Sequence, residues 1–146
     1  MRFWDSSALV PLLIEEPESA EMNRLLGADS EMALWWGTAT ECWSALARRE
    51  READWSPATT DEALANLQKV VGRAHEVLPT ATVRMHSRRL LFTHALRAAD
   101  ALQLAAAITL GGNEVAELEF VTLDDVLARC ARREGFRVLG KIGSHG

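Results

Sequence analysis

Cysteine is scarce in this sequence, and the sulfur atoms are not spaced for metal binding or thiol–disulfide exchange. Only two cysteines, Cys42 and Cys130, occur among 146 residues. They are far apart, form no C-x-x-C pair, and each falls on the apolar face of a predicted helix. We interpret both as thiols buried in the core.

Several patterns that identify enzyme or cofactor classes are also missing. The sequence contains no G-x-S-x-G motif, no P-loop and no G-x-G-x-x-G fingerprint. None of its four histidines has the spacing of a zinc ligand. These absences disfavour serine hydrolases, nucleotide-binding enzymes and zinc enzymes. They leave acidic side chains as the candidates for chemistry.

Long hydrophobic runs are lacking as well. The longest, around 104–110, is too short to cross a bilayer, which takes about 20 residues. The first residues lack the charged-then-apolar layout of a signal peptide, so we expect a cytoplasmic protein without a membrane segment. A net charge of −5 argues against indiscriminate nucleic-acid binding, although it allows a local basic rim.

What the sequence does contain is a regular alternation of strand and helix patterns. Strands are predicted at 1–5, 31–36, 76–78, 119–122 and 136–139. Helices are predicted at 7–15, 18–26, 37–53, 59–74, 82–92, 100–110 and 124–134. This alternation predicts a three-layer α/β fold with a mostly parallel central sheet. We expect one domain over 1–140 and a loose tail at 141–146.

Three of the predicted helix ends depend on single residues. Pro11 is tolerated best near a first turn, so it favours a helix start at 7 or 8. Gly27 is expected to close the second helix. Thr59 or Thr60 is expected to cap the fourth helix.

Acidic residues stand where predicted strands lead into helices. Asp5 and Asp124 follow strands, Glu41 lies early in the helix after the second strand, and Asp100 begins a very apolar helix. The carboxyl ends of parallel strands meet at one edge of a sheet, so we expect these side chains to converge. Clustered carboxylates raise one another's pKa unless a cation neutralises them. An all-oxygen site suits Mg²⁺ or Mn²⁺.

Structural interpretations of these acids compete with the functional one. Asp5 could cap the first helix, although the serines after it could do so equally well. The stretch Thr38–Glu41 fits a capping box, in which the glutamate reaches back to the start of the helix. The sequence pattern does not decide whether Asp124 or Asp125 supplies the fourth carboxylate.

Together these stretches resemble the PIN-domain family, and within it the VapC-type toxins of bacterial toxin–antitoxin pairs. The matching stretches follow the family's order and cover nearly the whole chain: Asp5–Leu9, Glu41, Ala99–Ala105, Phe120–Asp124 and Val138–Leu139. The resemblance implies a three-layer α/β/α fold and an endoribonuclease that depends on Mg²⁺ or Mn²⁺. It also implies a homodimer, and a cognate antitoxin that inhibits the enzyme by covering its site.

The resemblance also assigns roles within the site. Asp5 and Asp100 would be the main metal ligands, and Glu41 and Asp124 would complete the catalytic acidic site. Hydroxyl groups that support these ligands would come from Ser7 and Thr122.

Basic residues near the acids are possible contacts for an RNA substrate. Arg48 lies on the helix that contains Glu41, while Arg84 and Arg88 share one face of the helix before Asp100. The ordinary interpretation of such residues is a solvated helix face. A role in binding phosphate is the alternative.

Two other functions are also compatible with the sequence. The first is a non-catalytic PIN-like module that binds or regulates a partner, which would show no metal-dependent cleavage. The second is a phosphatase-like or receiver-like α/β domain. A haloacid-type phosphatase would need an aspartate two residues after Asp5, where Ser7 stands.

Overall fold

The centre of the protein is a parallel sheet, seen in a computed structural model that describes residues 1–140. The predicted tail at 141–146 lies outside the described residues. The strands are β1 (Arg2–Trp4), β2 (Met32–Trp35), β3 (His75–Val77), β4 (Glu119–Thr122) and β5 (Arg137–Gly140). Their order is β3-β2-β1-β4-β5. Because the winding reverses at β1, a crevice opens beyond the carboxyl ends of β1 and β4.

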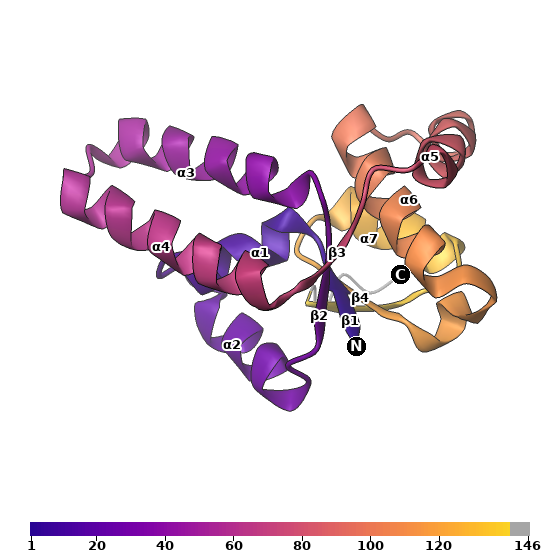
Figure 1. Ribbon diagram of the computed structural model, residues 1–146, viewed down its shortest axis with the longest axis horizontal. Helices are drawn as coiled ribbons and strands as arrows, with labels where there is room; N and C mark the ends of the chain where they lie inside the picture. Colours follow the sequence, from indigo (N-terminus) through magenta and orange to yellow (C-terminus); the bar gives the residue numbers. More distant parts are fainter. Residues whose placement is uncertain (141–146) are drawn as a thin grey trace.

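Helices cover both faces of this sheet (Figure 1). One face carries α1 (Ser6–Leu13), α2 (Ser19–Ala28), α3 (Thr38–Ala53) and α4 (Pro57–Arg73). The other carries α5 (Ala81–Thr93), α6 (Ala98–Gly111) and α7 (Asp125–Arg133), with a 3₁₀ helix, η1, at Gly112–Glu117. Figure 1 shows α3 and α4 as a pair that extends beyond the sheet. The predicted three-layer α/β/α fold is confirmed.

Strand side chains alternate between two cores, one on each face. Phe3 and Phe120 point to the α5–α7 side, where their rings stack at 5.4 Å. Trp4 and Val121 point to the α1–α4 side, and all four side chains are fully buried. This arrangement explains why β2 reads as a continuous apolar run: all of its residues are buried, because both of its faces are covered.

The two cysteines behave as the sequence predicts. Cys42 is buried on the α1–α4 side and Cys130 on the α5–α7 side, and both are free thiols. Burial raises the pKa of Cys42 to about 12, so its thiol stays protonated at neutral pH. Among residues 1–140, every helix is too short or too polar to cross a membrane.

The first two helices differ from the prediction at their ends. α1 begins at Ser6, so Pro11 lies inside the helix, in its second turn. The Pro11 carbonyl accepts a hydrogen bond from Ser19 Oγ at 2.7 Å, which ties α1 to α2. Gly27 does not close α2, because the helix continues through Ala28.

The starts of α4 and α6 also differ. Ser56 caps α4 by accepting a hydrogen bond from the Thr59 N–H at 3.2 Å, so neither predicted threonine is the cap. A serine followed by proline at the first helical position is the stronger start signal, because proline needs no hydrogen-bond acceptor there. α6 begins at Ala98, which makes Asp100 its third residue.

Candidate active site

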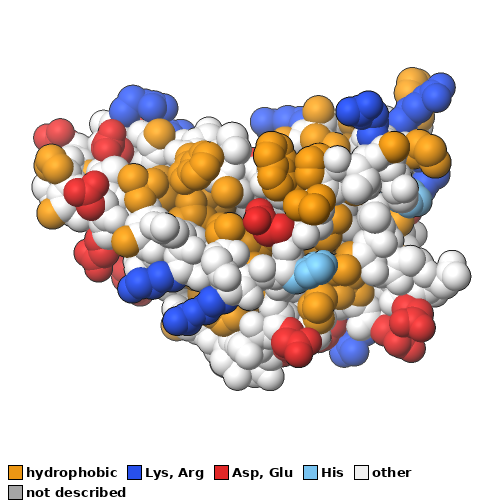
Figure 2. All heavy atoms as spheres, viewed as in Figure 1, with side chains coloured by type: hydrophobic (Ala, Val, Ile, Leu, Met, Phe, Trp, Pro, Cys, Tyr) orange, Lys and Arg blue, Asp and Glu red, His pale blue; other side chains and the backbone are white. Residues whose placement is uncertain are grey.

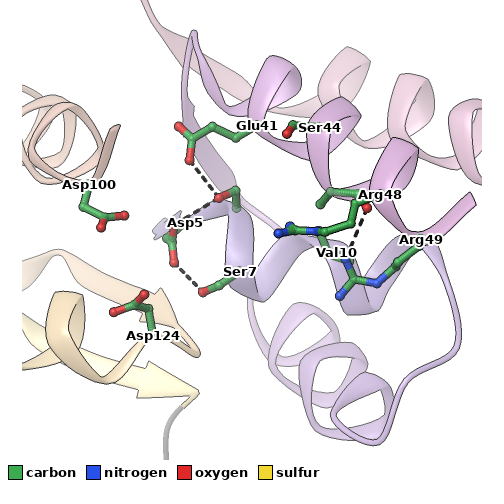
Figure 3. A pocket seen from close by; sticks show the side chains of 11 residues that line it. Asp5, Ser7, Val10, Glu41, Ser44, Arg48, Arg49, Asp100 and Asp124 are labelled. Carbon is green, nitrogen blue, oxygen red and sulfur yellow. Dashed lines mark hydrogen bonds between the residues drawn. The ribbon is translucent and has the colours of Figure 1, made fainter. Parts of the chain in front are cut away.

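The four predicted acids come from four different segments and line one pocket at the carboxyl edge of the sheet. Asp5 follows β1, Glu41 and Asp100 lie in the first turns of α3 and α6, and Asp124 precedes α7. The rest of the lining consists of Ser6, Ser7, Val10, Ser44, Ala45, Arg48 and Arg49. Figure 3 shows the acids gathered at one end of the pocket and the two arginines at the other.

Asp5 is the most deeply buried of the acids, with 2% of its surface exposed. Its Oδ2 accepts hydrogen bonds from Ser7 Oγ and, at 2.6 Å, from Thr122 Oγ1. Burial raises the pKa of Asp5 above its ordinary value of 3.8, and these two hydrogen bonds oppose the rise. Although Asp5 stands at the capping position of α1, its side chain makes no capping hydrogen bond.

The two hydroxyls beside Asp5 also fix the turn after β4. Ser7 Oγ accepts from the Leu123 N–H at 2.9 Å, and Thr122 Oγ1 accepts from the Asp124 N–H at 3.1 Å. The same groups therefore hold one carboxylate and place the backbone that carries another. The structure puts Ser7 and Thr122 where the sequence prediction needs them, and their role in catalysis remains a prediction.

Glu41 is held by two donors. Ser6 Oγ donates to Oε1 at 2.9 Å, and Gln103 Nε2 donates to Oε2 at 3.1 Å. The capping-box interpretation is wrong, because Thr38 is already the first helical residue and its Oγ1 accepts from Gln103 at 2.9 Å. Gly37 stands at the capping position, where a Cβ would collide with the Trp35 indole.

The pKa of Glu41 lies well above that of an exposed carboxyl group. Burial raises it from an ordinary value of 4.5 to about 7, and the negative charges of Asp5 and Asp100 add to the rise. Hydrogen bonds from Ser6 and Gln103 oppose it. A cation in the pocket would reverse the effect of this repulsion.

Asp100 is half-buried and has no side-chain hydrogen bond within the described part of the chain. Burial raises its pKa, followed by the charges of Asp124 and Asp5, while Arg97 opposes the rise. Its position in the first turn of α6 favours the charged form through the helix dipole.

The structure distinguishes the two adjacent aspartates that the sequence pattern left open. Asp124 lines the pocket, whereas Asp125 is exposed at the first position of α7 and is not part of the lining. Asp124 Oδ1 also accepts a hydrogen bond from the Leu127 N–H at 2.8 Å. Asp124 therefore lines the pocket and caps α7 at the same time.

The predicted RNA contacts separate into two groups. Arg48 lines the pocket beside Arg49, whose Nε is paired with Glu16 Oε1 at 2.6 Å. Arg84 and Arg88 are exposed on α5 and are not part of the pocket lining. Of the three predicted residues, only Arg48 lines the same pocket as the acids.

Comparison with known proteins identifies the family. The model of the family described as “PIN domain” matches residues 2–133 of this sequence. The chain belongs to the PIN-domain family. Ribonuclease VapC45 of Mycobacterium tuberculosis (strain CDC 1551 / Oshkosh) is 33% identical to this PIN domain over 110 residues, which cover 75% of this chain and 76% of the relative. The resemblance found in the sequence is confirmed.

Two solved structures share the fold of this PIN domain at low sequence identity. FitAcB from Neisseria gonorrhoeae has a TM-score of 0.67 and 15% identity, covering 95% of this chain and 96% of that one. VapBC2 from Rickettsia felis, bound to a DNA fragment from their promoter, has a TM-score of 0.65 and 14% identity, covering 94% and 96%.

The donor set of this PIN domain fits a hard divalent cation. Four carboxylates line the pocket, and neither histidine nor cysteine contributes to the lining. Within residues 1–140, no three acidic, histidine or cysteine side chains stand close enough together to form a ready metal cage. Mg²⁺ keeps several waters and needs few protein ligands, so a looser ring of carboxylates suits it.

Sequence reasoning missed two residues that hold the acids of this PIN domain, Ser6 and Gln103. Ser6 gave no separate signal in the sequence, because its neighbours Asp5 and Ser7 were the stronger candidates for the site. Gln103 carried a usable signal: it is the only polar residue in the apolar run Ala101–Ile108. It also lies three residues after Asp100, on the same helix face.

Proposed function

We propose that this PIN domain is a metal-dependent endoribonuclease and the toxin of a toxin–antitoxin pair. Its reaction would be hydrolysis of RNA phosphodiester bonds at the pocket lined by Asp5, Glu41, Asp100 and Asp124. The observation that carries the proposal is the convergence of these carboxylates, from four separate segments, on one pocket. The name of the relative, Ribonuclease VapC45, supports the reaction class. The VapBC2 neighbour supports pairing with an antitoxin.

The four carboxylates would hold Mg²⁺ or Mn²⁺. When bound, the ion would supply positive charge at the scissile phosphate and acidify water for attack on phosphorus. Ser7 and Thr122 would keep Asp5 oriented by donating to one of its oxygens. Without a cation, the clustered negative charges would repel a polyanion, so we expect strict metal dependence.

The opposite end of the pocket would bind the substrate backbone. Arg48 is exposed there, and a guanidinium matches the geometry of a phosphate. Arg49 is already paired with Glu16, so Arg48 is the better candidate for this contact. One pocket would then carry an acidic end for the cation and a basic end for a neighbouring phosphate.

The proposed activity is tested by cleavage of a mixed single-stranded RNA substrate with purified, antitoxin-free protein. Reactions contain Mg²⁺, Mn²⁺ or EDTA, and Asp5→Asn and Asp100→Asn run beside the wild type. Asp61→Asn is the matched control, because Asp61 is exposed on α4 outside the pocket lining. We expect cleavage only with metal, lost in both pocket variants and kept in the control.

Other results would contradict the proposal. Cleavage that persists in EDTA or in both pocket variants would come from another site or from a contaminant. A folded wild-type protein that cuts no RNA in Mg²⁺ or Mn²⁺ would favour a non-catalytic PIN-like binding module.

We also propose that the protein is a homodimer. Three large apolar side chains are exposed: Trp36 by 54%, Trp43 by 53% and Leu78 by 60%. The backbone N–H of Trp36 donates to the carbonyl of Val77, the residue before Leu78. Figure 2 shows hydrophobic side chains gathered over the face of the molecule that it displays. Patches of this kind mark association surfaces. Light scattering should give about twice the 16.1 kDa chain mass, and Trp36→Arg should lower it to that of a monomer.

A further inference from the structure

Gln103 is an unusual residue for its position. It is 0% exposed within an apolar stretch of α6, although a buried amide is costly unless its groups are hydrogen-bonded. Its Nε2 donates to Thr38 Oγ1 and to Glu41 Oε2, so the donors are used. Its Oε1 is buried with no hydrogen-bond partner in the described part of the chain. For the stability of α6 alone, an apolar side chain would serve better here.

The amide instead acts on Glu41. Each carboxylate oxygen of Glu41 accepts one hydrogen bond, Oε1 from Ser6 and Oε2 from Gln103. A carboxylate has about four acceptor positions, so both oxygens keep free lone pairs. Thr38, also 0% exposed, accepts a second hydrogen bond from the same amide nitrogen through Oγ1, and this contact limits the rotation of the amide.

The choice of an amide rather than a cationic side chain matters. Lysine or arginine at this position would neutralise Glu41 and compete with a metal ion for it. A neutral amide fixes the direction of the carboxylate and leaves its negative charge intact. Groups that orient metal ligands in this way commonly control metal affinity as strongly as some ligands do.

We propose that Gln103, anchored by Thr38, is a positioning residue that orients the Glu41 carboxylate for a divalent cation. The inference rests on the proposed function, since it assumes that the pocket takes such an ion. Gln103 itself is not part of the pocket lining, so its effect passes through Glu41.

The test is Mn²⁺ binding by isothermal titration calorimetry, with thermal unfolding in EDTA as a second readout. Gln103→Met keeps the length of the side chain and removes its donors. We expect Mn²⁺ affinity to fall about tenfold or more. We expect little change in thermal stability in EDTA, because removal of the buried, unpartnered carbonyl offsets the donors lost to Thr38 and Glu41. Gln68→Met, at an exposed position on α4, is the matched control and should change neither property.

The outcomes separate this inference from the proposed function. Wild-type affinity in a folded Gln103→Met protein overturns the positioning role and leaves the nuclease proposal standing. A folded wild-type protein that binds no Mn²⁺ overturns both. If Gln103→Met does not fold, Thr38→Val is the deciding variant. Thr38→Val should weaken Mn²⁺ binding, and Thr38→Ser should bind as the wild type does. Equal Mn²⁺ affinity in the wild type and both Thr38 variants overturns the positioning role.

Discussion

The two sides of the acidic pocket are built differently. On the α1–α3 side, Asp5 and Glu41 receive hydrogen bonds from hydroxyl and amide donors. On the α6–α7 side, Asp100 has no side-chain hydrogen bond within residues 1–140, and Asp124 uses one oxygen as a helix cap. The first pair is held in position, but burial of these carboxyl groups raises the pKa of both. The second pair has fewer side-chain hydrogen bonds to hold it within the described residues.

The largest expected effect tests whether both sides are needed for catalysis. Asp5→Asn and Asp100→Asn should each lower kcat/KM at least about 100-fold, or about 2.7 kcal/mol of transition-state stabilisation. Their stabilities should differ, because within residues 1–140 the Asp100 side chain has no hydrogen bond to lose. Its variant should stay within about 0.5 kcal/mol of the wild-type unfolding free energy in EDTA. Equal stability changes in the two variants would contradict the contrast between the sides.

The next prediction removes a hydroxyl that supports both sides of the pocket, because it donates to Asp5 and accepts from the Asp124 N–H. Thr122→Val keeps the shape of the side chain but deletes both of these hydrogen bonds. Because a buried acceptor loses its donor, the unfolding free energy should fall by about 1–3 kcal/mol in urea titrations. Thr109→Val is the control, since the one hydrogen bond of Thr109 Oγ1 among the described residues is donated to the Ala105 carbonyl of its own helix, at 2.8 Å. Comparable losses in the two variants would argue against a special role for Thr122.

The third prediction uses the raised pKa of Glu41 in metal-free protein. The unfolded chain releases this proton near the ordinary pKa of 4.5, whereas the folded protein keeps it until about 7. Stability should therefore fall as pH rises through that window. Glu41→Gln should remove part of the slope and be more stable than wild type at pH 8, by on the order of 1–2 kcal/mol. Urea titrations in EDTA at pH 4 and pH 8 measure this, and an unchanged slope would contradict it.

The smallest expected effect concerns the basic end of the pocket. Arg48→Ala should raise KM for RNA by about three- to tenfold with little change in kcat, and should lower the salt dependence of binding by about one phosphate contact. Arg84→Ala and Arg88→Ala, at exposed positions on α5, should have weaker effects. If they match Arg48→Ala, the substrate path runs over α5 as well.

Most of the fold and part of the site were predictable because their signals are local. The strand after Met1 and the helix after Asp5 follow from a few adjacent residues, and so does the break between β4 and α7. Helix starts were less reliable where caps competed: Ser56–Pro57 outweighed Thr59 and Thr60 because proline fixes the first helical residue.

The sequence by itself determined the alternation of strands and helices, and it placed acids at the carboxyl ends of β1 and β4. Only the tertiary structure decided that Asp124 rather than Asp125 lines the pocket, and that Gln103 reaches Glu41 across 62 positions of chain. The physical reason is the distance along the chain over which each signal acts. Periodicity and capping act within one turn or strand, whereas the partner of a buried amide depends on how α6 packs against the sheet.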